Sequence, residues 1–231
     1  LQTIINNIHK MKDQSKPILA IYIDLSKAYD TVSHPKLLQK LRNEFNFTPE
    51  ALSFFSSYFR NRQQETHTQN ATSKTQEITH GIPQGSTLST TLFLLYINNI
   101  IKTVPSSTVY TYADDTTLII TADNAQALQE LAQTELNNLI KYFHNNNLVP
   151  NPTKTTYTTF QKPNPAEPDA TTELTIIDGL YDPNLEQTKI AKLLGIYIQD
   201  TLKYDSTITS TVRKLYRLIQ IFRYATTLLP T

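Results

Sequence analysis

The sequence predicts an α+β domain rather than a doubly wound α/β sheet. Strand-like apolar runs are few, and two of them lie close enough together to pair as a hairpin. Helical segments come in blocks instead of alternating singly with strands. A chain of 231 residues, 39% of them hydrophobic, is long enough to bury a core as one large domain or two small ones.

The chain begins with a helix and a strand. Residues 1–12 have helical spacing, and "KPILAIYID" (16–24) is a short Ile-rich run that predicts a buried strand. A second helix is predicted over 33–45, with Pro35 near its first position. Asp24 therefore stands at the end of a buried strand.

A third helix and a polar segment follow. Thr48 is predicted to cap a helix over 48–59, whereas residues 63–80 are polar and lack a strong period. "GIPQG" (81–85) is a loop that leads into another helix. The side chains expected on one side of that helix are Leu88, Leu92, Leu95 and Tyr96.

A long amphipathic helix is predicted after the hairpin. Asp123 is expected to cap it, with Gln126 in the capping-box position. The side chains expected to face inward are Leu131, Ala132, Leu136, Leu139, Ile140 and Phe143. Beyond it we expect a loop leading into a strand at 150–160, a Pro-rich exposed connection at 163–173 and a strand at 190–199.

The last segment, 206–231, predicts a helix with an apolar stripe and a basic face. Val212, Leu215, Tyr216, Ile219 and Phe222 have helical spacing. The segment contains no acidic residue, and its basic residues are Arg213, Lys214, Arg217 and Arg223. A solvated face and a phosphate-contacting face explain this pattern equally well.

Composition excludes several classes of site. The absence of cysteine rules out disulfides and thiolate zinc sites, and the five histidines lack metal-ligand spacing. No run of 18 apolar residues and no signal-peptide pattern is present, so we expect an intracellular protein, nuclear or cytoplasmic, without a membrane partner. A net charge of +1 does not by itself indicate nucleic-acid binding.

Two adjacent carboxylates lie between the paired strand-like runs. In "TYADDTTLII" (111–120), Asp114 and Asp115 interrupt two β-forming segments, which on its own predicts a hairpin turn. If Asp24 ends a neighbouring antiparallel strand, the three carboxylates approach one another and repel unless a cation lies between them. Mg²⁺ prefers such oxygen ligands, and a pair of ions supports in-line phosphoryl displacement. The pattern therefore suggests nucleotidyl transfer.

Three further residues fit this chemistry, although each also has an ordinary structural explanation. Tyr29 could exclude a ribose 2′-hydroxyl or simply pack in the core. Gln84, in a loop made flexible by Gly81 and Gly85, could contact a nucleotide. Lys154 could protonate or stabilise departing pyrophosphate, or be an ordinary solvated lysine.

Five segments together resemble motifs A to E of reverse transcriptases. They are "YIDLSKAYDTV" (22–32), "GIPQGSTLS" (81–89), "YADD" (112–115), "NPTKT" (151–155) and "KLLGIYI" (192–198). "SKAYD", "LFLLYIN" and "SYFRNRQQ" are most similar to non-LTR, LINE-type retrotransposons. The resemblance covers roughly residues 16 to 223, and the first three motifs are highly specific as a set.

The resemblance implies a right-hand polymerase fold, with an antiparallel palm sheet backed by helices. The palm would comprise 16–34 and 81–205, the fingers portion 35–80, and the start of a thumb 206–231. It also implies RNA-templated DNA synthesis from dNTPs on a DNA primer, within a larger polyprotein. Further fingers residues would precede Leu1, and most of a thumb would follow Thr231.

The resemblance also implies residue roles. Asp24, Asp114 and Asp115 would hold two Mg²⁺ ions, for which Mn²⁺ could substitute, and Lys154 would be the general acid. Tyr29 would exclude ribose, while Gln84 and Gly85 would lie at the substrate. Leu194 and Gly195 would belong to a primer-gripping hairpin. The chain departs from the family's pattern at Thr90, usually Pro, and Asn99, usually Asp.

Two alternatives stay open at the level of sequence. An RNA-dependent RNA polymerase shares the palm, but Tyr29 as a barrier to the 2′-hydroxyl and "YADD" both argue against it. An inactive remnant that serves as a binding module is the other alternative, and the three intact aspartates argue against it.

Overall fold

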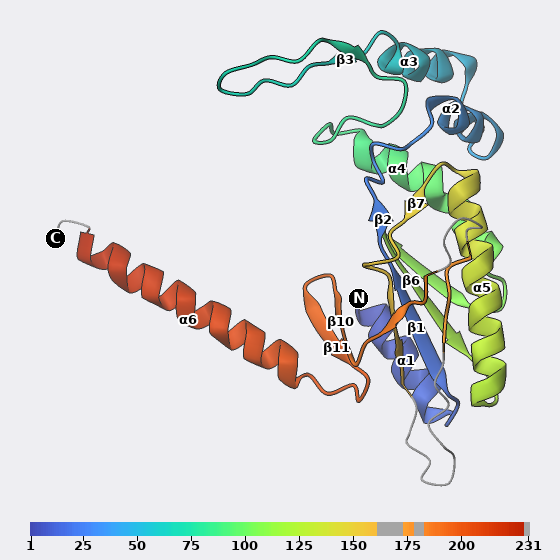
Figure 1. Ribbon diagram of the computed structural model, residues 1–231, viewed down its shortest axis with the longest axis vertical. Helices are drawn as coiled ribbons and strands as arrows, with labels where there is room; N and C mark the ends of the chain where they lie inside the picture. The colour runs from blue at the N-terminus through green and yellow to red at the C-terminus, as the bar shows by residue number, and fades with distance from the viewer. Residues whose placement is uncertain (161–172, 178–182, 229–231) are drawn as a thin grey trace.

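The structure is a computed structural model that describes residues 1–160, 173–177 and 183–228. At its centre is a five-stranded sheet in the order β5-β6-β1-β8-β9, antiparallel except for the β8–β9 pair (Figure 1). Its strands are β1 (Ile18–Ile23), β5 (Thr108–Tyr112), β6 (Asp115–Thr121), β8 (Thr156–Thr159) and β9 (Glu186–Gln187). The predicted strand at 16–24 is the central strand β1.

Helices accompany this sheet, and those predicted from the sequence are present. They are α1 (Gln2–Asp13), α2 (His34–Asn43), α3 (Pro49–Phe59), α4 (Ser89–Ile97), the 3₁₀ helix η1 (Asn98–Thr103), α5 (Ala125–Asn145) and α6 (Asp205–Leu228). Thr48 caps α3 as predicted, because its side chain accepts a hydrogen bond from the backbone N–H of Ala51 at 3.3 Å.

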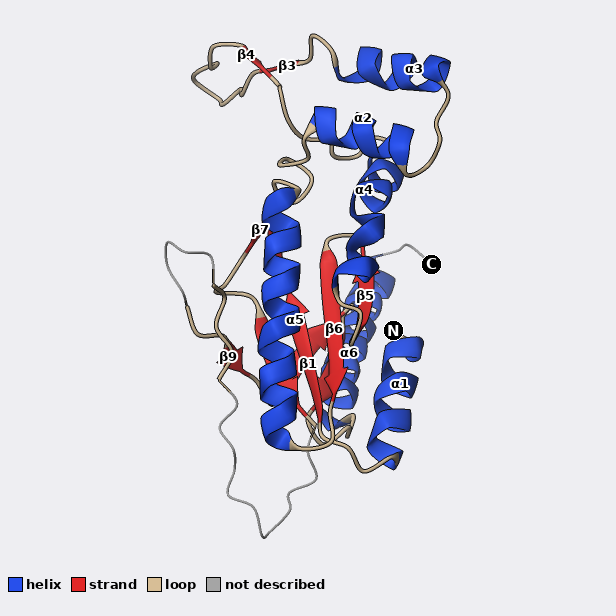
Figure 2. Cartoon of the chain, turned by 90° about the vertical axis from the view of Figure 1, so that its right-hand side faces the viewer, coloured by secondary structure: helices blue, strands red, loops and turns tan. Residues whose placement is uncertain are grey.

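Both faces of β1 carry buried side chains. On one face, Leu19, Ile21 and Ile23 join the main core with α4 and α5. On the other face, Ile18 and Ala20 join a second core with α1 and the hairpin formed by β10 (Ile190–Leu193) and β11 (Ile196–Gln199). Figure 2 shows the sheet between α5 and α1. β1 therefore has no solvent-facing side until its final residues.

The remaining elements extend from this body. Helices α2 and α3 and an arm containing β3 (Gln63–Gln64) and β4 (Gln76–Glu77) lie at one end of the molecule (Figure 1). A short pair, β2 (Leu25–Ser26) with β7 (Val149–Pro150), continues from β1. None of the helices within the described residues is long and apolar enough to cross a membrane.

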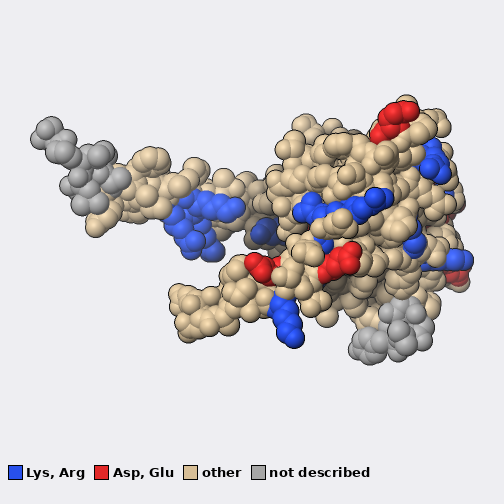
Figure 3. All heavy atoms as spheres, turned by 90° about the horizontal axis from the view of Figure 1, so that it is seen from above, with Lys and Arg blue, Asp and Glu red and all other residues tan. Residues whose placement is uncertain are grey.

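Helix α6 projects away from the body, with its N-terminal end beside β11 (Figure 1). The described part of the chain does not bury its predicted apolar stripe, since Leu215, Ile219 and Phe222 are 53%, 46% and 68% exposed. Lys and Arg side chains gather on one side of the helix (Figure 3). The helix was predicted correctly, but its packing does not follow from its periodicity.

Two local predictions are wrong. Asn124, not Asp123, caps α5, because its Oδ1 accepts from the Ala127 N–H at 2.9 Å. Asp123 instead pairs with Lys16 at 2.8 Å. Residues 190–199 form a hairpin rather than one strand, with the turn at Leu194 and Gly195. Of the predicted connection at 163–173, residues 163–172 lie outside the described residues.

Candidate active site

Asp24 follows directly after β1, where the chain passes into β2. Side chains alternate along the strand, so Asp24 and Tyr22 lie on the face opposite the α5 side. The carbonyl of Asp24 accepts a hydrogen bond from the Asn151 N–H at 2.8 Å. Its side chain is 33% exposed. The strand thus presents this carboxylate at the open end of the sheet.

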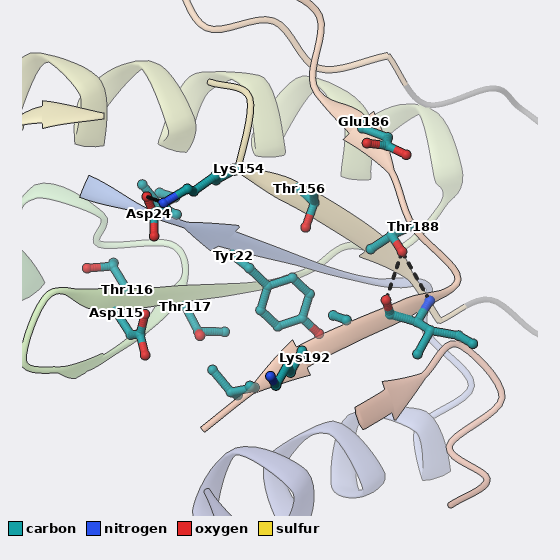
Figure 4. Close-up of a pocket in the computed structure, with 14 residues that line it drawn as sticks. Tyr22, Asp24, Asp115, Thr116, Thr117, Lys154, Thr156, Glu186, Thr188 and Lys192 are labelled. Carbon is teal, nitrogen blue, oxygen red and sulfur yellow. Dashed lines mark hydrogen bonds and ion pairs between the residues drawn. The ribbon is translucent and has the colours of Figure 1, made fainter. Parts of the chain in front are cut away.

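The second and third carboxylates come from the β5–β6 hairpin. Tyr112 and Asp115 are opposite each other, so the turn consists of Ala113 and Asp114 alone. Ala113 has a φ of 53°, in the left-handed region that residues with a Cβ rarely adopt. Asp115 is the first residue of β6 and lies on the same side of the sheet as Asp24 (Figure 4).

The three carboxylates influence one another electrostatically. The pKa of Asp115 is raised, first by partial removal of its carboxyl from water and then by the negative charges of Asp114 and Asp24. Among the described residues, however, no three acidic, His or Cys side chains converge closely enough to form a ready-made metal site. The structure therefore brings the carboxylates of Asp24, Asp114 and Asp115 close enough to interact electrostatically, but not close enough to coordinate one metal ion as they stand.

Lys154 provides a positive charge beside these carboxylates. Its Nζ lies 3.6 Å from Asp24 Oδ2, which makes an ion pair longer than a hydrogen bond. The lysine belongs to a turn built on Asn151, whose Oδ1 accepts from the N–H and the hydroxyl of Thr153 at 3.2 and 2.8 Å. The predicted general acid therefore lies next to a predicted metal ligand.

A cavity of about 290 Å³ opens beside these residues. Asp24, Asp115 and Lys154 line one end of it (Figure 4). Tyr22 of β1 and Lys192 of β10 line another part, where the cavity borders the β10–β11 hairpin (Figure 4). Glu186 lies on the side away from Asp24 and Asp115 (Figure 4). The lining therefore carries three carboxylates and two lysines, a charge distribution that suits anionic ligands only when cations accompany them.

Tyr29 and Gln84 form a second group outside the lining of this cavity. The Tyr29 ring stacks on the buried ring of Phe93, with centroids 4.7 Å apart. The Tyr29 carbonyl accepts from the Ile82 N–H at 2.9 Å, and Gln84 Nε2 donates to Asp30 Oδ1 at 3.1 Å. The segment carrying Tyr29 is therefore fastened to the "GIPQG" loop.

Glycine is required at the start of that loop. Gly81 has a φ of 87°, and a Cβ there would lie 2.9 Å from the Asp30 carbonyl oxygen. Gly85 also has a positive φ, 81°, but open space surrounds the position of its missing Cβ. Gly81 allows the loop to approach the backbone of Asp30 closely. At Gly85, glycine is favoured only because φ is positive.

Leu194 and Gly195 form the two-residue turn between β10 and β11. Their φ values are 49° and 84°, as the tight turn of a two-residue hairpin requires. Neither residue lines the cavity, although Leu193, directly before them, does. The hairpin that the family resemblance implied is therefore present, with its turn beyond the cavity.

Residues 1–198 match the family described as reverse transcriptase (RNA-dependent DNA polymerase). The chain belongs to the reverse transcriptase family. Two Drosophila melanogaster proteins are similar to this reverse transcriptase domain. The probable RNA-directed DNA polymerase from transposon BS is 26% identical over 216 residues, which are 89% of this chain and 22% of that protein. The RNA-directed DNA polymerase from mobile element jockey is 25% identical over 167 residues, which are 69% of this chain and 18% of that protein.

The reverse transcriptase domain spans about a fifth of the length of these relatives. Solved structures of telomerase from Candida tropicalis share its fold. The complex with a fragment of telomeric RNA has a TM-score of 0.58 at 13% identity, covering 89% of this chain and 33% of that one. The apo structure has a TM-score of 0.57 at 13% identity, and the match covers 89% of this chain and 36% of that one. These likenesses confirm the predicted α+β polymerase fold.

Sequence reasoning missed several residues that build the site of this reverse transcriptase domain. Asp30 holds Gln84, and the buried Thr155 accepts from the Asp24 N–H at 3.4 Å. Lys192 adds a second cation to the cavity. The Asn-Pro-Thr run at 151–153 was a usable signal for the turn that carries Lys154. The other contacts depend on chain segments far apart in sequence.

Proposed function

We propose that this domain catalyses RNA-templated DNA synthesis, transferring nucleotides from dNTPs to the 3′-hydroxyl of a DNA primer. The observation that carries the proposal is the group of three interacting carboxylates beside an open cavity, in a chain of the reverse transcriptase family. In the complete protein, this domain would be the polymerase core of a LINE-type retrotransposon polyprotein. Residues 16–34 and 81–205 would form the palm, 35–80 the fingers portion and 206–231 the start of a thumb.

Asp24, Asp114 and Asp115 would hold two divalent cations, Mg²⁺ or Mn²⁺. Their chemistry fits these ions, because carboxylate oxygens are preferred ligands and added positive charge would offset the repulsion on Asp115. When bound, such cations would supply Lewis-acid activation of the attacking 3′-hydroxyl and positive charge beside the leaving pyrophosphate. Lys154 would give a proton to that pyrophosphate, and Tyr29 would exclude nucleotides that carry a 2′-hydroxyl.

The remaining roles concern alignment of substrate and duplex. Gln84, with Gly85 beside it, would contact the incoming nucleotide or the template, and its bond to Asp30 would orient the amide. The hairpin carrying Leu194 and Gly195 would support the primer end. Contacts to nucleic acid would be mainly to phosphate and sugar, so binding would weaken as salt increases.

Primer extension with dTTP on a poly(rA) template and a DNA primer, with Mg²⁺ or Mn²⁺, tests this function. We expect incorporation by the wild type and a loss of at least a hundredfold in Asp24→Asn and Asp114→Asn. Asp123→Asn is the matched control, because Asp123 pairs with Lys16 away from the cavity and should retain activity. Equal activity of Asp114→Asn and wild type would refute the assigned role. Incorporation of ribonucleotides alone would indicate an RNA polymerase.

A further inference from the structure

Asp24 has a positively charged partner that belongs to the chain itself. Lys154 Nζ lies 3.6 Å from Asp24 Oδ2, and this is the one ion pair within the acidic group among the described residues. Lys192 lines the same cavity, but over the described part of the chain its ammonium makes no ion pair. Lys154 is therefore paired with a carboxylate of the group, whereas Lys192 only adds positive charge to the cavity.

The pair is of a kind that a stronger cation can displace. The side chains of Lys154 and Asp24 are 67% and 33% exposed, and their separation exceeds hydrogen-bond length. Exposed pairs of this type contribute little, because water competes for both charges. A divalent cation has twice the charge and prefers carboxylate oxygen, so it should replace the ammonium at Asp24.

The backbone that carries Lys154 is tied to Asp24 independently of the ion pair. The Asn151 N–H donates to the Asp24 carbonyl at 2.8 Å, and the Asp24 N–H donates to Thr155 Oγ1 at 3.4 Å. The same hydroxyl donates to the Asn151 carbonyl at 2.8 Å, and Thr155 is completely buried. Displacement therefore moves the flexible lysine side chain while its Cα stays beside the site.

We propose that Lys154 is an internal counter-cation for Asp24, which a divalent metal must displace in order to bind. The inference rests on the proposed function, because it takes the three aspartates as the metal site. It has two consequences. The free protein binds divalent metal more weakly than its carboxylates alone would, and metal binding releases an ammonium that remains available to an anionic phosphate.

The test measures metal affinity rather than catalysis. Mn²⁺ is titrated into the complete chain without nucleotide or primer, and free Mn²⁺ is followed by its electron paramagnetic resonance signal. We expect Lys154→Gln to bind Mn²⁺ about three- to tenfold more tightly than wild type, because the competing charge is gone. Lys192→Gln, the matched control, removes one charge from the same cavity and should change affinity less than twofold.

A conservative variant separates competition from a structural effect of substitution. Lys154→Arg keeps a positive charge on a long side chain and should retain the weak affinity of wild type. Tight binding by both Lys154→Gln and Lys154→Arg would overturn the proposal, since the charge would then be irrelevant. An equal increase in Mn²⁺ affinity in Lys154→Gln and Lys192→Gln would also overturn it, because loss of any positive charge from the cavity would then explain both results.

Failure of the proposed function gives a different result. If Asp24→Asn and Asp114→Asn bind Mn²⁺ as wild type does, the aspartates are not the metal site, and the function fails together with this inference. If those variants lose affinity while Lys154→Gln remains at the wild-type value, the metal site stands and the counter-cation role is wrong. Circular dichroism of each variant verifies that it is folded.

Discussion

At the scale of single residues, burial and neighbouring charges disfavour the ionisation of Asp115 in the candidate site. The pKa of Asp115 is higher in the folded chain than in the unfolded chain, so folding disfavours the ionised carboxylate. As pH rises through the folded-state pKa, Asp115 ionises and the free energy of unfolding decreases. Asp115→Asn should therefore raise the metal-free melting temperature at pH 7 by about 1–2 °C, while abolishing activity. Differential scanning fluorimetry at low salt measures this change.

The same experiment contains its own controls. Millimolar Mg²⁺ should narrow the difference between wild type and Asp115→Asn, because a cation offsets the repulsion that the substitution removes. Asp123→Asn should lower the melting temperature slightly or leave it unchanged, since it loses the pair with Lys16. A lower melting temperature for metal-free Asp115→Asn would show that the carboxylate stabilises the fold.

Tyr29 offers a second residue-scale prediction. Tyr29→Ala should increase the use of rUTP relative to dUTP by about tenfold or more, because the ring that would exclude the 2′-hydroxyl is removed. Tyr29→Phe keeps the stacked ring on Phe93 and should discriminate as wild type does. Single-nucleotide extension rates for both substrates provide the measurement. Unchanged discrimination in Tyr29→Ala would assign the ring to packing alone.

Sequence could propose the three aspartates as a group because their motifs are local and specific, and their role stays a prediction. It could not show that Lys154 lies 3.6 Å from Asp24, or that Gln84 is held by Asp30, because these contacts join distant segments. The two glycines of "GIPQG" looked equivalent in sequence. The structure separates them, since only at Gly81 would a Cβ collide with another segment.

At the scale of elements, the β5–β6 turn positions two of the carboxylates and contains one strained residue. Ala113 has a φ of 53°, which glycine adopts without penalty. Ala113→Gly should increase the free energy of unfolding by about 0.5–1 kcal/mol, measured by urea denaturation. Ala127→Gly, in helix α5, should decrease it by about 1 kcal/mol. Destabilisation by both substitutions would contradict the assigned strain.

Helix α2 is attached to the body by lysines one turn apart. Lys36 donates to the Asn145 carbonyl at the end of α5, and Lys40 donates to the Tyr96 carbonyl, both at 2.5 Å. Lys40 also contacts Asn99 Oδ1 at 3.0 Å, which gives a structural role to one of the chain's departures from the family pattern. These bonds join α2 to α4, η1 and α5.

Burial lowers the pKa of Lys40 from 10.5 to about 8, which makes this attachment pH-dependent. Between those pH values the unfolded chain binds more protons than the folded chain, so the contribution of Lys40 to stability increases with pH. From pH 7.5 to 9.5, wild type should gain about 1 kcal/mol relative to Lys40→Met in urea denaturation, allowing for partial exposure. A pH-independent difference would contradict the assignment.

Element types were more predictable than their boundaries and ends. The α5 helix followed from its apolar period, but two adjacent cap-forming residues, Asp123 and Asn124, made its start ambiguous. The strand-like composition of 190–199 concealed the turn, because Leu194, with a φ of 49°, looks like a strand residue. Only the family resemblance indicated a hairpin at Leu194 and Gly195.

At the scale of the whole molecule, two helices with similar amphipathic patterns have opposite environments. Leu139 of α5 is fully buried, whereas Leu215 of α6 is 53% exposed. Leu139→Ala should therefore reduce the free energy of unfolding by about 2–5 kcal/mol, and Leu215→Ala should change it by less than about 0.5 kcal/mol. Urea denaturation measures both. A large loss in Leu215→Ala would mean that α6 packs on the body in solution.

Periodicity establishes that a helix has an apolar side but not what covers that side. For α5, the neighbouring sheet supplies the cover, and the predicted Leu136, Leu139 and Phe143 are all buried. For α6, the described chain supplies none beyond its start near β11, where Thr207 Oγ1 donates to the Tyr197 carbonyl at 2.9 Å. The fold class was therefore predictable, whereas the surroundings of α6 were not.

The central place of β1 has a consequence for biosynthesis. Ile18 is opposite Thr121 and Leu19 is opposite Thr159, so both neighbours of this early strand emerge from the ribosome roughly a hundred residues or more after it. Until then the nascent chain carries an unpaired apolar strand, ILAIYI, whose exposed surface favours aggregation. Premature termination before Thr156 would leave Asp24 on a strand without one of its partners, a product fit for proteolysis rather than polymerisation.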